Sequence, residues 1–257
     1  MLEPASLNGP RAKLRRAQEH LEALDAEARA YGEREPYSVT RERDPLEGWQ
    51  VAYFHIHEPP PIRLGIILGD FFYNLRSCLD HLAWQLVLLD GGTPGDHTAF
   101  PVIRDFGNWK SGGGGVLKGI GKGHFDAIET LQPYPTRNDP CSRALEVVDT
   151  CCNRDKHKTL HPAFAVLDPR PEALILQREP FFAANVEVHY PGAGKPLEDG
   201  AEFARLHVTT PEPQPGAHME VEFPIVLGFG ESGLAIKSLP QIAMLIESVV
   251  EQFTPDF

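Results

Sequence analysis

The chain has 257 residues, of which 42% are hydrophobic and 23% charged, and its formal net charge is −12. This composition is typical of a globular protein with a substantial core, and no apolar run reaches the roughly 18–20 residues that a membrane-spanning helix needs, so we expect no membrane span. The acidic balance disfavours non-specific binding to nucleic acid, so that any such role needs a local basic site.

The spacing of the cysteines and the sequence of the first residues indicate in which cellular compartment the protein is expected. The four cysteines lack the CxxC spacing of metal sites, and the opening sequence, MLEPASLNGPRAKLRR, lacks the apolar core of a signal peptide. We therefore expect reduced, buried or half-buried thiols in a cytoplasmic protein that carries no cofactor and no metal. The cysteines are Cys78, Cys141, Cys151 and Cys152.

A helix and a hairpin are predicted at the start of the chain. Residues 10–33 place apolar side chains at helical spacing and have a glycine near their end, which indicates an amphipathic helix. Two runs of strand-forming residues follow within 37–57, separated by the turn sequence Asp-Pro-Leu-Glu-Gly. This second segment predicts a β-hairpin.

The longest helical pattern covers residues 62–90, and we expect the rest of the chain to pack around it. Its broad apolar face comprises Leu64, Phe71, Leu75, Leu79, Leu82, Leu86 and Leu89. The other side carries short polar side chains where a solvated helix would carry Lys and Glu: Asp70, Asn74, Ser77, His81 and Gln85. We expect this polar side to face a cleft or another protein surface.

The glycine-rich region that follows, 91–123, is expected to be mostly loop. Its run Gly112–Gly115 matches neither a P-loop nor a dinucleotide fingerprint, and no apolar strand leads into it, so a flexible linker or lid is favoured over a phosphate site. Helical structure is predicted to resume at His124–Leu131, followed by a turn at Gln132–Pro135 and a further helix from about Pro140 to Asp155.

The last third of the chain changes pattern. Short alternating runs over 164–229 predict an antiparallel sheet, and residues 238–253 predict a closing helix. Since helices come from both ends of the chain, we predict one α+β domain, residues 1–257. In it a helical bundle (10–33, 62–90, 124–155 and 238–253) carries a sheet inserted before the last helix, with the 37–57 hairpin beside that sheet.

The central helix contains Asn74-Leu75-Arg76-Ser77-Cys78-Leu79-Asp80-His81, in which four residues separate an arginine from a histidine. In that form it resembles the HEPN superfamily of helical domains, whose motif is Arg, four to six residues, then His. The chain is also similar to a group of uncharacterised bacterial proteins that carry a GD-x3-NLRS-x-LDH helix and a later DKH segment, here Asp155-Lys156-His157.

The HEPN resemblance implies a HEPN-like bundle and a metal-independent endoribonuclease of the toxin or defence kind, with its site assembled from two subunits. Arg76 would then hold the scissile phosphate and His81 would transfer protons, with Asn74 or Ser77 orienting the imidazole. The partners implied are RNA, a second copy of the chain and an antitoxin-like protein.

A second hypothesis is a non-catalytic binding or interaction protein. Arg76 and His81 point about 140° apart on a straight helix, and Asp80 lies one turn from the arginine, where it can form an ion pair with it. In this alternative the polar side packs as a hydrogen-bonded network against the helix that bears Asp155 and His157. The residues expected to bind are Asp70, Ser77, Asp80, Asp155, Lys156 and His157.

Overall fold

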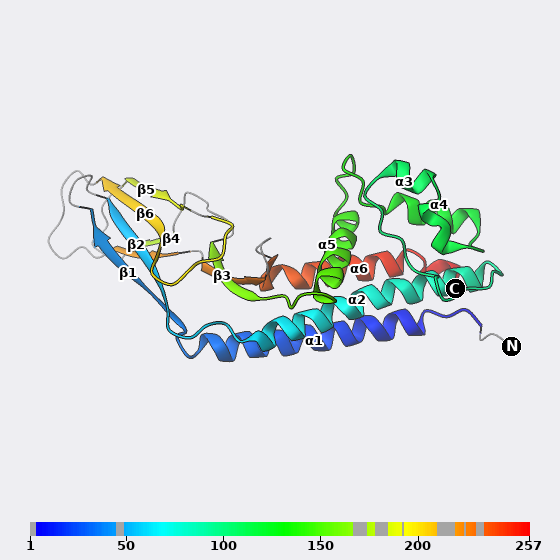
Figure 1. Cartoon of the computed structure of the whole chain (residues 1–257), viewed down its shortest axis with the longest axis horizontal. Coiled ribbons are helices and arrows are strands. Elements are labelled where there is room, and N and C mark those ends of the chain that lie inside the picture. The colour runs from blue at the N-terminus through cyan, green and yellow to red at the C-terminus, as the bar shows by residue number, and fades with distance from the viewer. Residues whose placement is uncertain are drawn as a thin grey trace. The chain divides into compact units, whose positions relative to one another are not determined.

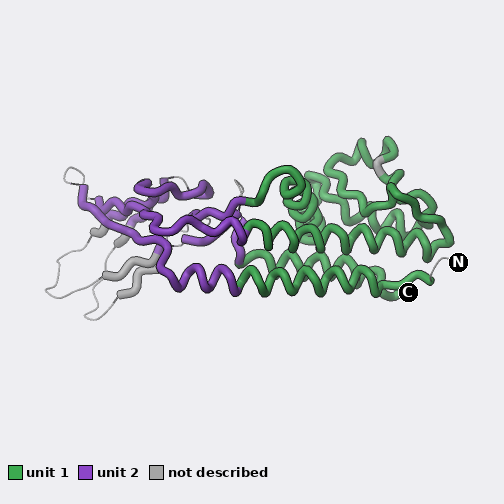
Figure 2. Tube along the Cα trace, turned by 60° about the horizontal axis from the view of Figure 1, so that its bottom comes forward, with its two compact units in different colours: residues 1–25, 65–160, 237–257 green, residues 26–64, 161–236 purple. Residues whose placement is uncertain are grey.

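The computed structural model describes residues 4–44, 49–166, 174–177, 185–191, 193–209, 219–223, 225–229 and 234–257. It divides the chain into two compact units (Figure 2). Unit 1 comprises residues 1–25, 65–160 and 237–257, and unit 2 comprises residues 26–64 and 161–236. The α+β class expected from the sequence is confirmed, whereas the single domain and the HEPN-like bundle remain predictions.

Helices dominate unit 1 and begin and end close to the predicted residues (Figure 1). The long ones are α1 (Asn8–Gly32), α2 (Ile62–Leu89), α4 (Lys122–Thr130), α5 (Pro140–Asp155) and α6 (Leu239–Glu251). The start of α5 is capped by Asp139, whose carboxylate accepts the Ser142 N–H at 2.8 Å. The end of α2 is set by Gly91, which has a positive φ of 76° that favours glycine.

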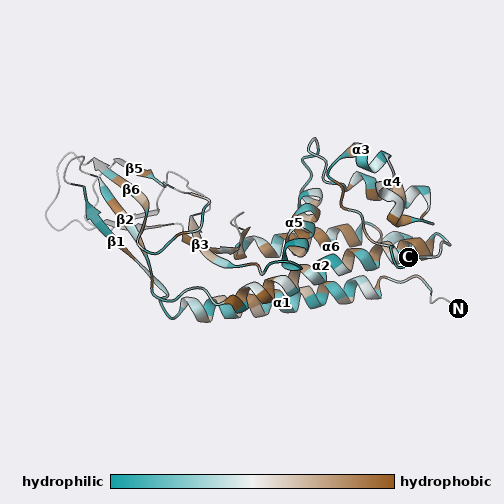
Figure 3. Cartoon of the chain, in the orientation of Figure 1, coloured by the Kyte–Doolittle hydropathy of each residue, from teal (hydrophilic) through white to brown (hydrophobic). Residues whose placement is uncertain are grey.

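The apolar face predicted for α2 forms the core of unit 1. Six of its seven predicted core residues are buried, Leu64, Phe71, Leu75, Leu79, Leu82 and Leu86, and Leu89 is half-buried. The hydropathy colouring shows apolar residues concentrated along α6 and parts of α2 (Figure 3). None of the helices that the structure describes is both long enough and apolar enough to cross a membrane.

Helices α1 and α2 lie antiparallel, side by side (Figure 1). The Ser6 N–H just before α1 donates to Gln85 Oε1 at 2.9 Å, and one turn further on Gly9 lies against the imidazole of His81. The register is therefore fixed, and it places the first half of α1 along the polar side of α2.

The region 91–123 contains more structure than the sequence predicts. A short helix, α3 (Phe106–Lys110), and a 3₁₀ turn, η1 (Gly113–Leu117), interrupt the expected loop. Asp105 caps α3, and the Trp109 ring lies 4.8 Å from Phe125 of α4, centroid to centroid. An aromatic anchor and a cap, neither of which produces a long periodic pattern, thus order the segment. The two helices predicted after this region, 124–131 and 140–155, are confirmed as α4 and α5.

Unit 2 holds the strands. They are β1 (Tyr37–Arg43), β2 (Gln50–Ile56), β3 (Pro162–Val166), β4 (Leu174–Gln177), β5 (Asn185–His189), β6 (Ala201–Thr209), β7 (Met219–Glu222), β8 (Ile225–Phe229) and β9 (Leu234–Ala235). In the described residues they form antiparallel sheets of order β1-β2-β6-β5, β3-β8-β9 and β4-β7.

The hairpin is correctly predicted, although the middle of its turn, residues 45–48, lies outside the described residues. The prediction of one sheet over 164–229 with the hairpin beside it is wrong. The hairpin instead continues into β6 through the pairing of β2 with β6, which includes Ala52 opposite Ala204. Strand alternation reveals which face of a strand is buried but not which other strand it will pair with, and this explains the error.

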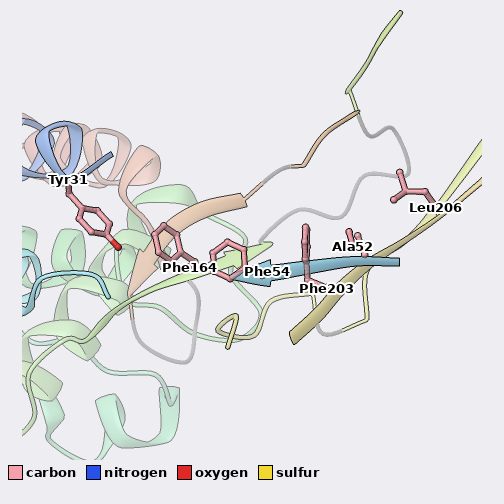
Figure 4. Packing of buried hydrophobic residues seen from close by; sticks show 7 residues of the cluster. Tyr31, Ala52, Phe54, Phe164, Phe203 and Leu206 are labelled. Atoms are coloured by element: carbon pink, nitrogen blue, oxygen red, sulfur yellow. The ribbon is translucent and has the colours of Figure 1, made fainter. Parts of the chain in front are cut away.

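Unit 2 has its own aromatic core (Figure 4). The ring of Phe54 lies 5.3 Å from that of Phe164 and 6.1 Å from that of Phe203, and Tyr37 lies 4.9 Å from Phe164. Tyr31, at the end of α1, is also buried in this cluster and donates its hydroxyl hydrogen to the Glu58 carbonyl at 2.6 Å. These contacts tie the end of the helix to the sheets of unit 2.

Candidate functional site

Arg76 is held in a network of partly buried groups. Its Nη2 donates to Asp80 Oδ1 at 2.9 Å and to the Phe100 carbonyl at 2.7 Å, and its Nη1 lies 3.8 Å from Asp149 of α5. Only 16% of its side chain is exposed. Asp80 completes the arrangement by accepting the Phe100 N–H at 2.9 Å. The pair Arg76–Asp80 thus fastens the backbone of Phe100 to α2, and the intrahelical ion pair that the spacing allows is present.

The same network extends to the surface through Arg104. Its Nε lies 2.9 Å from Glu146 of α5, and its Nη2 donates to Thr150 at 2.7 Å and lies 3.7 Å from Asp149. Asp149 therefore stands between two guanidinium groups. The structure gives these residues a role in joining α2, the segment after Phe100 and α5.

Asn74 is bonded to the backbone of its own helix. It is buried, and its Nδ2 donates to the Asp70 carbonyl at 2.8 Å, one turn earlier on the same helix. Ser77 is half-buried on the next turn. The amide of Asn74 thus satisfies a helix carbonyl, and the orienting role expected for Asn74 or Ser77 stays a prediction.

His81 lies at the exposed edge of α2, next to α1. A side chain at Gly9 would begin 3.1 Å from its Nδ1, so the imidazole rests against the backbone of α1. Partial removal from water lowers the pKa of His81, the charge of Lys13 lowers it further, and Asp80 opposes the shift. The imidazole is therefore mainly neutral at pH 7 and able to accept a proton.

Two aromatic side chains are exposed on α2, one before and one after His81 in the sequence. Tyr73 is 55% exposed and Trp84 36% exposed, and their spacing of eleven residues puts both on one side of α2. The Nζ of Lys13 lies 5.7 Å from the centre of the Tyr73 ring. Within the described part of the chain Lys13 makes no ion pair, whereas its neighbours Arg11 and Arg16 are paired with Glu251 and Glu19.

The two segments of the GD and DKH pattern meet in the structure. Gly69 lies against the carboxylate of Asp155, and a Cβ at position 69 would come within 3.0 Å of it. Burial raises the pKa of Asp155, and the nearby charge of Asp70 raises it further. Asp70 also acts on His20 of α1, whose pKa burial nevertheless lowers. Of the predicted binding residues, Asp70 and Asp155 are thus brought together.

The remaining predicted residues stay apart from these. Lys156 and His157 are exposed at the end of α5, where the Lys156 Nζ lies 3.4 Å from Asn153 and the His157 backbone N–H donates to the Arg154 carbonyl. The packing of the whole polar side of α2 against Asp155 and His157 is contradicted: Asp70 alone approaches Asp155, and His81 lies against α1.

Several residues of the site escaped prediction. Arg104, Asp149 and the backbone of Phe100 carry no local pattern that would reveal their meeting with Arg76. Lys13 and His20 could have been found, because their spacing of seven residues puts them on one face of the first helix. Pairing that face with the polar side of α2 would have placed Lys13 beside His81.

Other reactive groups give no second centre. The cysteine thiols are free, and burial raises the pKa of Cys78 to about 12. Among the described residues no cluster of His, Cys, Asp or Glu could hold a metal ion. His124 bridges Asp90 at 2.8 Å and Asp256 at 3.4 Å beside a cavity of about 320 Å³, an arrangement that fastens the end of the chain to α4.

These features describe an α+β protein whose helical unit presents a histidine, a lysine and two aromatic rings on the exposed side of α1 and α2. No protein-family model, curated protein or solved structure matches the chain.

Proposed function

We propose that the protein is a metal-independent endoribonuclease in which His81 transfers protons. The proposal is carried by one observation: His81 is exposed on α2 against the backbone of α1, where burial and the charge of Lys13 lower its pKa and so favour the neutral imidazole. A neutral imidazole at an accessible surface suits the removal of a proton from the 2′-hydroxyl of RNA.

The reaction needs no redox partner or cofactor. The 2′-oxygen of RNA bonds to the adjacent phosphorus while the bond from phosphorus to the 5′-oxygen breaks. His81 takes the 2′-hydroxyl proton, and the leaving 5′-oxygen receives a proton from water or from a second copy of the chain. The products are a 2′,3′-cyclic phosphate and a 5′-hydroxyl end.

Arg76 has a supporting part in this proposal. Its guanidinium is engaged with Asp80 and the Phe100 carbonyl, so within one chain it stabilises α2 rather than the phosphate. This departs from the role that the HEPN resemblance implies for the arginine. A toxin or defence role, a homodimer and an antitoxin-like protein partner belong to the same proposal and follow from the resemblance alone.

The test is cleavage of a single-stranded RNA in EDTA by wild type, His81→Ala and His189→Ala. His189 is an exposed histidine of β5 that is paired with Glu187 at 3.0 Å, and it serves as the control. We expect His81→Ala to lose cleavage and His189→Ala to keep it. The rate for wild type should rise with pH and reach half of its plateau below pH 6.5, the ordinary value for histidine.

The second candidate is a non-catalytic binding protein that uses the same surface. It is favoured by the engagement of Asn74, Arg76 and Asp80 in structural hydrogen bonds. Binding of RNA without cleavage by a folded wild type, at every pH from 5 to 8, would establish this candidate in place of the ribonuclease.

A further inference from the structure

The exposed surface beside His81 combines two kinds of group that a nucleic-acid strand requires. One is a positive charge for the phosphate, and the other is an aromatic face on which a base can stack. Lys13 supplies the first and Tyr73 the second, and the two already lie within 5.7 Å of each other. Trp84 lies three turns along α2 on the same side, roughly 16 Å from Tyr73.

Lys13 is a basic residue on the first half of α1 whose Nζ lies over an exposed ring of α2, that of Tyr73. Arg11 is bound to Glu251 through contacts of 3.0 and 3.1 Å, and Arg16 to Glu19 at 2.6 Å. Lys13 makes no ion pair in the described residues, and its charge reaches His81. In a chain of net charge −12, an unpaired cation beside the exposed ring of Tyr73 is a local exception to the overall field.

We propose that Lys13, and not Arg76, supplies the cation that binds the phosphate at His81, and that Tyr73 and Trp84 form the stacking platform for single-stranded RNA. The inference rests on the proposed ribonuclease function and deepens it, since it names the group that would offset the charge developing on the phosphate. An Arg76 that is 16% exposed and bonded to a backbone carbonyl is not available for that role.

The geometry has a consequence for selectivity. A lysine binds the phosphate charge and an aromatic ring stacks on any unpaired base, so neither contact distinguishes one base from another. We therefore expect single strands to bind more tightly than duplexes of the same sequence, whose bases are already stacked on one another and cannot reach Tyr73.

The first test measures binding alone, with the full-length chain and a 12-nucleotide single-stranded RNA. The RNA carries 2′-O-methyl groups, so that it cannot be cleaved, and binding is followed by fluorescence anisotropy in EDTA. Lys13→Ala should weaken binding about fivefold or more and reduce the slope of log Kd against log salt by about one. Lys13→Arg should restore binding, and Tyr73→Ala should weaken it by a factor of at least about five.

The matched control is Lys110→Ala. Lys110 also lies over an aromatic ring, 4.4 Å from the centre of exposed Phe106, but it belongs to α3. This variant should bind RNA as wild type does. Equal losses in Lys110→Ala and Lys13→Ala would overturn the proposed site, as would a folded wild type that does not bind the RNA.

A second measurement follows the imidazole itself. In an NMR titration Lys13→Ala should raise the pKa of His81, because the lysine charge is removed, and Lys110→Ala should leave it unchanged. A His81 pKa that does not respond to Lys13→Ala would contradict the proximity on which the site depends.

The experiments distinguish failure of the proposed RNA-binding site from failure of the proposed ribonuclease function. Cleavage that needs His81 but proceeds unchanged in Lys13→Ala overturns the site and leaves the function. RNA binding that needs Lys13 and Tyr73, without cleavage of unmodified RNA, supports the site and removes the function.

Discussion

Replacing Arg76 by alanine should destabilise the protein by about 3 kcal/mol. The change removes hydrogen bonds to the Phe100 carbonyl and to Asp80, each of which involves a charged group and contributes on the order of 1.5–3 kcal/mol. Breaking a buried ion pair costs about 3–5 kcal/mol, whereas an exposed pair contributes about 0–1 kcal/mol. Asp80 is 34% exposed and keeps its bond to the Phe100 N–H, so the loss should fall between these limits.

Urea unfolding followed by circular dichroism at pH 7 measures this loss. The control is Arg16→Ala, which removes an exposed pair with Glu19 whose side chains are 58% and 59% accessible, and it should cost about 0.5 kcal/mol or less. If Arg76→Ala were as stable as Arg16→Ala, the structural account of Arg76 would be refuted. Loss of RNA cleavage in such a stable variant would return the arginine to the catalytic role that the HEPN motif implies.

The remaining predictions concern three glycines and Asp155. Gly65 and Gly69 of α2 lie against Leu160 and against Asp155 at the end of α5, and Gly123 of α4 serves as the control. Gly65→Ala should destabilise the protein severely, since a Cβ there would overlap the backbone carbonyl of Leu160. Gly69→Ala should lower the free energy of unfolding by less, because its clash is with the side chain of Asp155, and Asp155→Ala should therefore restore the lost stability. Gly123→Ala, which has open space in α4, should instead stabilise by about 0.5–1 kcal/mol, and urea unfolding of each variant checks all three. Asp155→Asn should stabilise the protein at pH 7. The pKa of Asp155 is raised in the folded state, so the ionised carboxylate lowers the stability of the wild type above that pKa. The advantage of the variant should therefore shrink as the pH falls through the folded-state pKa towards the unfolded value of 3.8. A stability difference between Asp155→Asn and wild type that is constant from pH 7 to pH 4 would contradict the raised pKa.

Periodicity was sufficient to predict the hairpin and the helices α1, α2, α4, α5 and α6, but not the short α3. The apolar face of α2 recurs every three or four residues, and nearly all of the residues it selects are buried. The same information could not place the strands within sheets, since β2 pairs with β6 across some 150 residues that follow no common pattern. The same limit applies to the candidate site. The angular separation of Arg76 from His81 could be predicted from helix geometry, but the residues that contact each of them lie on distant segments and could not.

The contact between Gly69 and Asp155 illustrates what sequence inspection lacks. The second hypothesis places the polar side of α2 against the helix that bears Asp155, but nothing in either segment indicates that Gly69 is the residue in contact with the carboxylate. A glycine inside a helix weakens that helix, and only the carboxylate packed against it explains its presence. The spacing along one element could therefore reveal candidate residues but not their partners.

The fastening of Phe100 has a consequence for which changes the chain can accept. Asp80 accepts the N–H of that residue and Arg76 donates to its carbonyl, so the two side chains bind both backbone groups of one residue as a neighbouring β-strand would. These two hydrogen bonds do not depend on the side chain at position 100. The identity of that residue is constrained only by the buried space that the Phe100 ring fills. Leucine or methionine could therefore replace the phenylalanine and keep both bonds, whereas proline, which has no N–H, would lose the bond to Asp80 while remaining apolar.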